Sequence, residues 1–385
     1  MRKGKFIKIR LQSNFVKQKK STTHSIQILG TRGIPASHGG FETFAEALSL
    51  YLEEKNWDVT VYCQKDSDSV SIENSQWKGI NLVHISTPLK GSLGSVLFDL
   101  LAIIQAVKRR TPMLILGYNT ACFSILPKLF SIPTAMNMDG IEWKRGKWGR
   151  IAKFWFWLNE SFGRMFSDLM IADHPEIEKH LRRFGTKKPI VMIPYGSHEI
   201  TEAMVDEKIL TLWNLTKNGY ALVIARVEPE NSVLEIVQGF SMQKRNFKLV
   251  IVGPVEEKNA YHTEVLKAAN SEVIFTQAQY DVTVTRTLRF FAKFYCHGHT
   301  VGGTNPSLLE SMGAGSAILA HDNLFNQWVA GDGAKYFKNA EECGRMMGEM
   351  ESAGLNTGRD LVYNRFQAQF RWGNILDLYE KSLLS

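Results

Sequence analysis

Short runs of apolar residues alternate along the chain with longer stretches in which apolar positions recur every three or four residues. The short runs predict buried strands, and the longer stretches predict amphipathic helices. In the first half of the chain the predicted strands are 25–29, 59–63, 81–85, 113–116, 134–138, 169–172 and 190–193. In the second half they are 221–225, 248–252, 272–276, 292–296 and 317–320. Strands that alternate with helices are typical of parallel sheets, so the sequence predicts an α/β fold.

The two series of strands predict two domains, each a doubly wound parallel sheet. We expect the first domain at 25–197 and the second at 198–365, because 385 residues are enough for two sizeable cores. Residues 1–24 form a basic extension, and residues 366–385 form a helix that we expect to pack back on the first domain. We expect no membrane-spanning segment, because glycine, asparagine and proline interrupt the most apolar stretch, 111–138.

Most glycine-rich and polar segments directly follow a predicted strand. Open α/β sheets bind ligands at the carboxyl ends of their strands, so we expect two such edges to face each other across an interdomain cleft. A Rossmann dehydrogenase is disfavoured, because the first loop, 30–40, is too long and irregular for the dinucleotide fingerprint. Within that loop, Gly39 and Gly40 precede a predicted helix and suit a phosphate contact or a lid; the alternative is an ordinary strand–helix turn.

Residues 299–310 predict a second turn that opens onto a helix. Asn305 suits the N-cap, and the proline after it suits the first helical position. The turn residues Gly302, Gly303 and Thr304 lie where a backbone can approach a ligand closely, and a helix N-terminus favours phosphate. Glu310 lies one turn further, within reach of hydroxyls beside that phosphate. The alternative is an ordinary loop before a buried helix.

Charged residues follow two further predicted strands, and a segment that is both basic and aromatic comes after one of them. Arg226 suits contacts to diphosphate oxygens, although it could instead pair with Glu228 or Glu230. Asp139 and Glu142 could orient a sugar hydroxyl or transfer a proton, or they could cap a helix or pair with Lys144 and Arg145. Residues 143–166 combine cations with tryptophan and phenylalanine, which suits a helix at a membrane surface or a core helix whose cations reach solvent.

The formal charge of +8 belongs to the N-terminal extension rather than to the fold. Residues 1–20 hold eight lysines and arginines and no acid, and the rest of the chain has 38 basic and 38 acidic residues. Nucleic acid is therefore disfavoured as a partner. The extension also has large apolar residues, so it could lie on an anionic membrane or be a disordered extension.

Four widely spaced cysteines form no CxxC pair, so neither a zinc site nor a disulfide framework is indicated. This pattern fits a reducing cytoplasm. The sequence also shows no acidic cluster that would hold a metal, and we expect neither a metal nor a cofactor.

Four stretches give the chain a resemblance to the retaining glycosyltransferases of family 4. They are 30–43 (GTRGIPASHGGFET), 137–145 (NMDGIEWKR), 226–231 (RVEPEN) and 297–312 (HGHTVGGTNPSLLESM), in the order that the family shows. The resemblance implies the GT-B fold, in which two Rossmann-like domains face a cleft. Within the family, the chain is most similar to bacterial rhamnosyltransferases of cell-surface polysaccharide synthesis.

The resemblance implies roles for particular residues. Glu310 matches the second glutamate of a paired-glutamate motif, near the donor ribose, and Arg226 matches the arginine that holds the diphosphate. Gly39 and Gly40 match the glycine loop beside the donor phosphates. Two departures stand out: Gly302 replaces the first glutamate, and Asn231 replaces a diphosphate lysine.

These roles imply a retaining, metal-independent transfer of a sugar from a nucleoside diphosphate to a glycan or lipid-linked acceptor. The resemblance favours dTDP-L-rhamnose as the donor, with a UDP-sugar second. We take Asp139 and Glu310 as the catalytic candidates, and Glu142, Lys144 and Arg145 as acceptor-side candidates. We expect the protein in the cytoplasm, peripheral on the inner face of the cell membrane. The alternative from another class is a noncatalytic protein that binds a nucleotide-sugar or a membrane.

Overall fold

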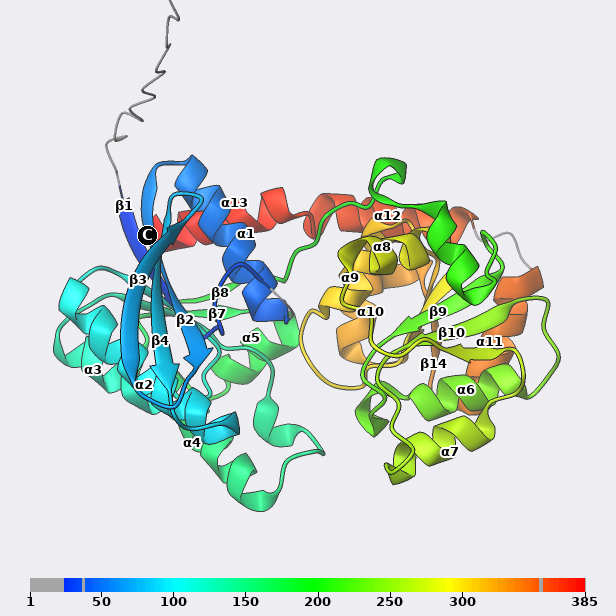
Figure 1. The fold of residues 1–385 in the computed structure, drawn as a ribbon, viewed down its shortest axis with the longest axis horizontal. Helices are drawn as coiled ribbons and strands as arrows, with labels where there is room; N and C mark the ends of the chain where they lie inside the picture. The colour runs from blue at the N-terminus through cyan, green and yellow to red at the C-terminus, as the bar shows by residue number, and fades with distance from the viewer. Residues whose placement is uncertain (1–23, 37–38, 353–355, 385) are drawn as a thin grey trace, which may run out of the picture.

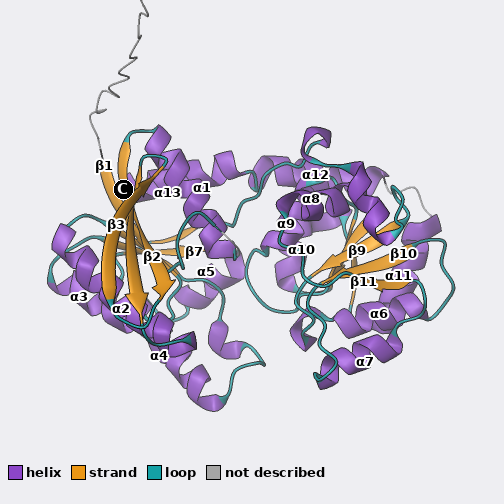
Figure 2. Cartoon of the chain, viewed as in Figure 1, coloured by secondary structure: helices purple, strands orange, loops and turns teal. Residues whose placement is uncertain are grey.

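A computed structural model of the chain describes residues 24–36, 39–352 and 356–384. The chain forms two α/β domains, each with a twisted sheet between layers of helices (Figures 1 and 2). Apart from His24, which begins the first strand, the basic extension 1–24 lies outside the described residues.

The first domain contains an eight-stranded sheet in the order β3-β4-β2-β1-β5-β6-β7-β8. Its strands are β1 (His24–Leu29), β2 (Trp57–Asp66), β3 (Ser71–Trp77), β4 (Ile80–Thr87), β5 (Met113–Leu116), β6 (Thr134–Asn137), β7 (Leu169–Ala172) and β8 (Ile190–Met192). All neighbours are parallel except β3, which runs antiparallel to β4 at the sheet edge. All seven predicted strands are confirmed. β3 was not predicted, because its side chains are mostly polar and exposed and therefore carry no apolar alternation.

The second domain contains a six-stranded parallel sheet in the order β11-β10-β9-β12-β13-β14. Its strands are β9 (Tyr220–Ile224), β10 (Lys248–Val252), β11 (Val273–Phe275), β12 (Phe294–His297), β13 (Ile318–His321) and β14 (Lys335–Phe337). The five predicted strands are confirmed, with ends that shift by one or two residues. The three-residue edge strand β14 was missed, because so short a segment gives no periodicity.

Helices cover both faces of each sheet. They are α1 (Gly40–Glu54), α2 (Gly91–Arg109), α3 (Ile125–Leu129), α4 (Arg150–Phe166), α5 (Pro175–Arg182), α6 (Val233–Ser241), α7 (Ala260–Ala268), α8 (Val282–Phe291), α9 (Pro306–Gly313), α10 (Leu324–Ala330), α11 (Ala340–Ser352), α12 (Asn356–Gln369) and α13 (Trp372–Leu384). Of the described helices, α2 alone has the length and composition to cross a membrane, with a mean hydropathy of 1.4. In the fold, Phe98, Ala102 and Ala106 of α2 are buried in the core on one face of the first sheet.

The last two helices join the domains. α12 packs in the core of the second domain through Val362 and Phe366. α13 then crosses to the first domain (Figure 1). There Trp372 and Tyr379 pack beside Phe44 of α1. The final helix therefore connects the second domain to the first. The carboxyl ends of the strands of the two sheets lie on either side of a cleft.

Candidate functional site

The turn between β12 and α9 has the local structure that its residues predict. Asn305 caps α9, because its side-chain oxygen accepts from the backbone N–H of Ser307 at 2.9 Å. Pro306 occupies the first helical position, where a missing N–H costs nothing. Gly302 has a φ of +119°, in the region that favours glycine.

This turn fits between two loops of the first domain. The carboxylate of Asp173, directly after β7, accepts from the backbone N–H of Thr304 at 3.0 Å. A Cβ on Gly303 would lie 2.1 Å from the same carboxylate, so a side chain there would displace it. On the other side, a Cβ on Gly140 would lie 3.7 Å from the Cα of Gly302. The carboxyl edges of the two sheets are thus in direct contact.

Asp173 contacts the glycine turn of the candidate site, and the sequence analysis did not single it out. The rule that singled out Asp139 applies to it as well, because it is the first residue after a predicted strand. Both aspartates line a small cavity of about 30 Å³ together with Asn137, Tyr195 and Tyr379. The structure therefore brings together two carboxyl groups next to the glycine turn.

The environment makes both carboxyl groups hard to ionise. Burial, together with the charges of Glu142 and Asp173, raises the pKa of Asp139 to about 7. Burial also raises the pKa of Asp173 to about 6, against the lowering effect of the Thr304 hydrogen bond. One oxygen of Asp173, Oδ1, is buried without a partner among the described residues. Carboxyl groups with such pKa values can hold or release a proton near neutral pH.

The first-domain glycines lie opposite α9. Gly39 precedes α1 with a φ of +105°, and a Cβ on Gly40 would lie 3.4 Å from Cγ of Pro306. The hydroxyl of Tyr195 donates to the backbone oxygen of Gly40 at 3.0 Å. The N-termini of α1 and α9 therefore point into one region, where both helix dipoles favour negative charge.

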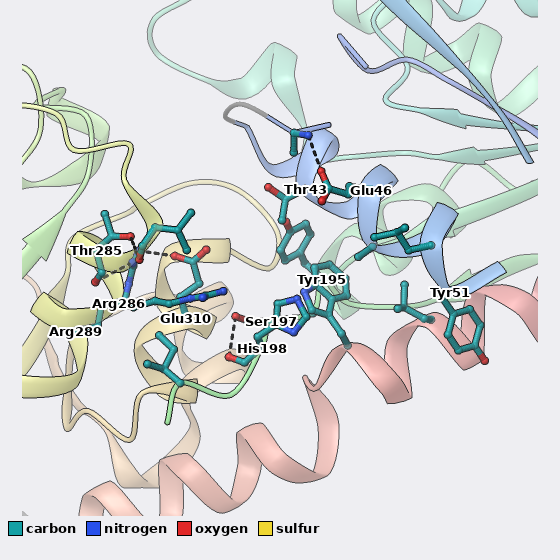
Figure 3. A pocket seen from close by; sticks show the side chains of 18 of the residues that line it. Thr43, Glu46, Tyr51, Tyr195, Ser197, His198, Thr285, Arg286, Arg289 and Glu310 are labelled. Carbon is teal, nitrogen blue, oxygen red and sulfur yellow. Dashed lines mark hydrogen bonds and ion pairs between the residues drawn. The ribbon is translucent and has the colours of Figure 1, made fainter. Parts of the chain in front are cut away.

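Glu310 lies on α9 and lines an interdomain cleft with a volume of about 510 Å³. The cleft is bounded by α1, α8 and the segment 195–198 (Figure 3). The Glu310 carboxylate pairs with Arg289 of α8, with 2.5 Å between Oε2 and Nη2. The sequence analysis missed Arg289, because its pairing depends on how α8 and α9 pack.

The two residues expected to meet the diphosphate do not line this cleft. Arg226 is more than half exposed and pairs with Glu228 at 3.2 Å, which is one of the alternatives that the sequence left open. Asn231 is buried, and its side-chain N–H donates to the backbone oxygen of Arg226 at 2.8 Å. Asn231 thus holds the loop that carries Arg226.

The acceptor-side candidates lie at a junction between the domains. Arg145 pairs with Glu142 at 2.7 Å and also with Glu230 of the second domain. Glu142 accepts a further hydrogen bond from the indole of Trp148 at 3.1 Å. The ammonium group of Lys144 lies 5.4 Å from the ring centre of Trp143. Glu142 and Arg145 are thus committed to contacts within the protein.

No group of three histidine, cysteine, aspartate or glutamate residues in the described part of the chain is arranged to hold a metal ion.

Comparisons with known proteins agree with this architecture. Residues 23–198 match a family described as a domain of unknown function, DUF1972. No curated protein matches the chain.

Solved structures with the same fold cover nearly the whole chain. Sucrose-phosphate synthase from Thermosynechococcus elongatus has a TM-score of 0.72 and 14% identity, over 94% of this chain and 99% of that one. An α,α-trehalose-phosphate synthase (UDP-forming) from Burkholderia xenovorans, in complex with glucose-6-phosphate, has a TM-score of 0.71 and 10% identity, over 94% and 100%. Anabaena HepE in complex with UDP and glucose has a TM-score of 0.71 and 12% identity, over 94% and 99%. The chain has the fold of these GT-B glycosyltransferases, with two Rossmann-like domains that meet at a cleft.

Proposed function

We propose that the protein is a retaining glycosyltransferase that takes a sugar from a nucleoside diphosphate. The observation that carries this proposal is the convergence of two helix N-termini, those of α1 and α9, beside a cleft that Glu310 lines. A diphosphate suits the helix N-termini, and a carboxylate at the cleft wall suits the hydroxyls of a nucleotide's sugar ring. The solved structures with this fold include one that holds UDP and glucose, which supports the same class of ligand.

In the proposed reaction, an acceptor hydroxyl attacks the anomeric carbon on the face from which the diphosphate leaves. The bond to the diphosphate oxygen breaks, and that phosphate takes the proton of the attacking hydroxyl, so the protein supplies no nucleophile. Backbone N–H groups at α1 and α9 stabilise the charge that builds up on the leaving group. Arg226 has an exposed side chain that can leave Glu228 to join them.

Asp139 would act on the sugar side of the cleft. Its raised pKa allows the carboxyl group either to accept from a sugar hydroxyl or to donate to one at neutral pH. It lies next to Gly140, which adjoins the glycine turn, and this position supports a role beside the transferred sugar.

We propose dTDP-L-rhamnose as the donor and a UDP-sugar as the second choice, on the basis of the sequence resemblance. The acceptor would be a glycan or lipid-linked saccharide in bacterial cell-surface polysaccharide synthesis. We propose that transfer needs no metal, so EDTA should leave the rate unchanged.

Calorimetric titration with dTDP, UDP and GDP, followed by a donor-by-acceptor transfer screen, tests this function. Glu310→Gln and Arg226→Ala should each lower transfer at least tenfold, because each removes a charged contact worth about 1.5–3 kcal/mol. The matched controls are Arg345→Ala and Glu349→Gln, which disrupt an exposed ion pair on α11. If the transfer rate is unchanged in both Glu310→Gln and Arg226→Ala, the proposed active site is wrong. Binding without any turnover would favour the noncatalytic alternative, and a preference for UDP or GDP would remove the rhamnose assignment.

We also propose that the protein binds the inner face of the cell membrane through α4. Ile151, Phe154 and Trp157 are 88%, 62% and 44% exposed, with Arg150 and Lys153 on the same helix. The fully buried residues of α4 are instead small or polar: Asn159, Glu160 and Gly163. An amphipathic helix with cations beside exposed aromatic side chains suits an anionic lipid surface.

A further inference from the structure

Arg289 has an unusual position for an arginine, because its side chain is almost fully buried although it lines the cleft. It is 4% exposed and projects from α8 toward α9. One nitrogen, Nη2, makes both the 2.5 Å contact to Glu310 and a 3.1 Å hydrogen bond to the hydroxyl of Ser307. The other, Nη1, donates to the backbone oxygen of Thr285 at 3.4 Å. Both terminal nitrogens of the guanidinium group therefore have partners within the protein.

Ser307 is itself fixed. Its hydroxyl lies 2.8 Å from the hydroxyl of Tyr295 and donates to the backbone oxygen of Ile224, the last residue of β9, at 3.2 Å. Glu310 is thus connected through Arg289 and Ser307 to the main chain of β9 in the sheet of the second domain. A side chain held by such a network keeps one rotamer, which removes the entropy cost of ordering it when a ligand binds.

This arrangement leaves the two oxygens of Glu310 unequal. Oε2 is the oxygen nearest to the Arg289 guanidinium, at 2.5 Å from Nη2, and among the described residues Oε1 accepts no hydrogen bond. The side chain is 38% exposed. It lines the cleft shown in Figure 3. A carboxylate that binds two neighbouring hydroxyls commonly uses one oxygen for each. The ion pair draws Oε2 toward the buried Arg289 and makes it the weaker acceptor, so Oε1 is the oxygen better placed for a ligand hydroxyl.

We propose that Arg289 is a positioning residue that sets nucleotide specificity. By occupying Oε2, it restricts Glu310 to one hydroxyl of the nucleotide's sugar ring, so the site accepts a 2′-deoxyribonucleotide as readily as a ribonucleotide. This inference rests on the proposed function, because it assumes that a nucleotide occupies the cleft.

The test compares UDP with dUDP, which differ by the 2′-hydroxyl alone, by calorimetry on the full chain. The wild type should bind the two with dissociation constants within about twofold of each other. In Arg289→Met, Oε2 becomes available for the second hydroxyl, and the preference for UDP should rise about fivefold or more, as expected for one hydrogen bond to a charged group. Arg245→Met is the matched control, because it removes another buried arginine of the same domain that hydrogen-bonds to backbone oxygens. It should leave the UDP:dUDP ratio unchanged.

A preference of tenfold for UDP in the wild type, or an unchanged ratio in Arg289→Met, would overturn the inference and leave the proposed function standing. If neither nucleotide binds the wild type, the proposed function fails and the inference fails with it. If Arg289→Met does not fold, Arg289→Lys replaces it. A lysine cannot reproduce the guanidinium fork, so the ratio should move in the same direction by a smaller factor, and an unchanged ratio would again overturn the inference.

Discussion

At Gly302 the backbone φ of +119° explains why the chain departs from the paired-glutamate pattern that it resembles. Nothing lies within 4 Å of a Cβ built on Gly302, so space alone would allow a side chain. The backbone conformation is what disfavours glutamate there, because residues with a Cβ rarely adopt it. Glu310 keeps its place on α9, and the partner that it has in this structure is Arg289.

Asp139 should make stability fall as pH rises. Its pKa in the folded state, about 7, lies above its ordinary value of 3.8, so the folded protein holds this proton between about pH 4 and pH 7 after the unfolded chain has lost it. The stabilisation by the protonated form is therefore present at low pH and lost as pH rises through 7. Asp139→Asn should remove this dependence, because asparagine stays neutral and tolerates the φ of +49°.

We expect Asp139→Asn to be more stable than the wild type at pH 8 by roughly 1–2 kcal/mol, and about equal to it at pH 4. Urea unfolding at both pH values measures this difference. Asp99→Asn is the control, because burial also raises the pKa of the Asp99 carboxyl, to about 6. This substitution should change the pH dependence of the free energy of unfolding less, and the change should be complete at a lower pH. If the free energy of unfolding changes between pH 4 and pH 8 by the same amount in the wild type and in Asp139→Asn, the prediction is wrong.

Among the elements, α4 differs from a usual surface helix, because it packs Phe156 and Phe162 against the core and also exposes further large apolar side chains to solvent. Its side chains toward the protein include Asn159 and Glu160, which are satisfied by hydrogen bonds: Asn159 accepts from the backbone of Cys122, and Glu160 accepts from the indole of Trp143. Its exposed side includes aromatic residues. The sequence left open a core helix with cations that reach solvent, and the burial of Asn159 and Glu160 rather than Phe154 and Trp157 argues against that alternative.

The triple substitution Ile151→Ser, Phe154→Ser and Trp157→Ser should weaken binding to anionic liposomes at least tenfold. The reason is the loss of apolar surface that the membrane would otherwise remove from water, at ~25 cal/mol per Å². Flotation or sedimentation with phosphatidylglycerol vesicles measures the effect. Leu212→Ser, Met242→Ser and Leu361→Ser form the control set, because these side chains are similarly exposed but lie in the second domain. Equal binding by the two triple variants would reject α4 as the membrane contact.

For the whole molecule, polar contacts at the cleft, the packing of His174 against Phe325 and Trp328, and the packing of α13 hold the domains in their relative positions. Asp173 to Thr304 and Arg145 to Glu230 cross the cleft, and α13 packs against the first domain. The Asp173 carboxylate occupies the turn where the sequence predicted a phosphate, so an incoming diphosphate and this carboxylate would compete for the same N–H group. Donor binding is therefore expected to coincide with movement at this contact.

Gly303→Ala should loosen the closed arrangement. The new Cβ would lie 2.1 Å from the Asp173 carboxylate and force it away from Thr304. Loss of a hydrogen bond to a charged group should shift the balance toward separated domains by about 1.5–3 kcal/mol, seen as a larger radius of gyration in small-angle scattering. The control is Gly373→Ala on α13, where nothing lies within 4 Å of the added Cβ. An identical radius of gyration for both variants would show that the Asp173 contact does not hold the domains together.

The sequence by itself determined the twelve predicted strands, the α/β class and the capped start of α9. These features depend on apolar periodicity and on residues close together in the chain, such as Asn305 and Ser307. β3 escaped prediction because main-chain pairing with β4, rather than buried side chains, defines it.

Only the tertiary structure decided which charges meet. Arg226 pairs with Glu228, Arg289 with Glu310, and Asp173 with the Thr304 backbone, although the sequence offered several partners for the first and signalled neither of the others. Such pairs join residues 2 to 131 positions apart, and the choice among them depends on burial and on the packing of helices and domains. The periodicity of apolar residues along the sequence does not indicate that packing. Ion pairs depend on distances between residues in the folded chain, which short stretches of sequence do not determine.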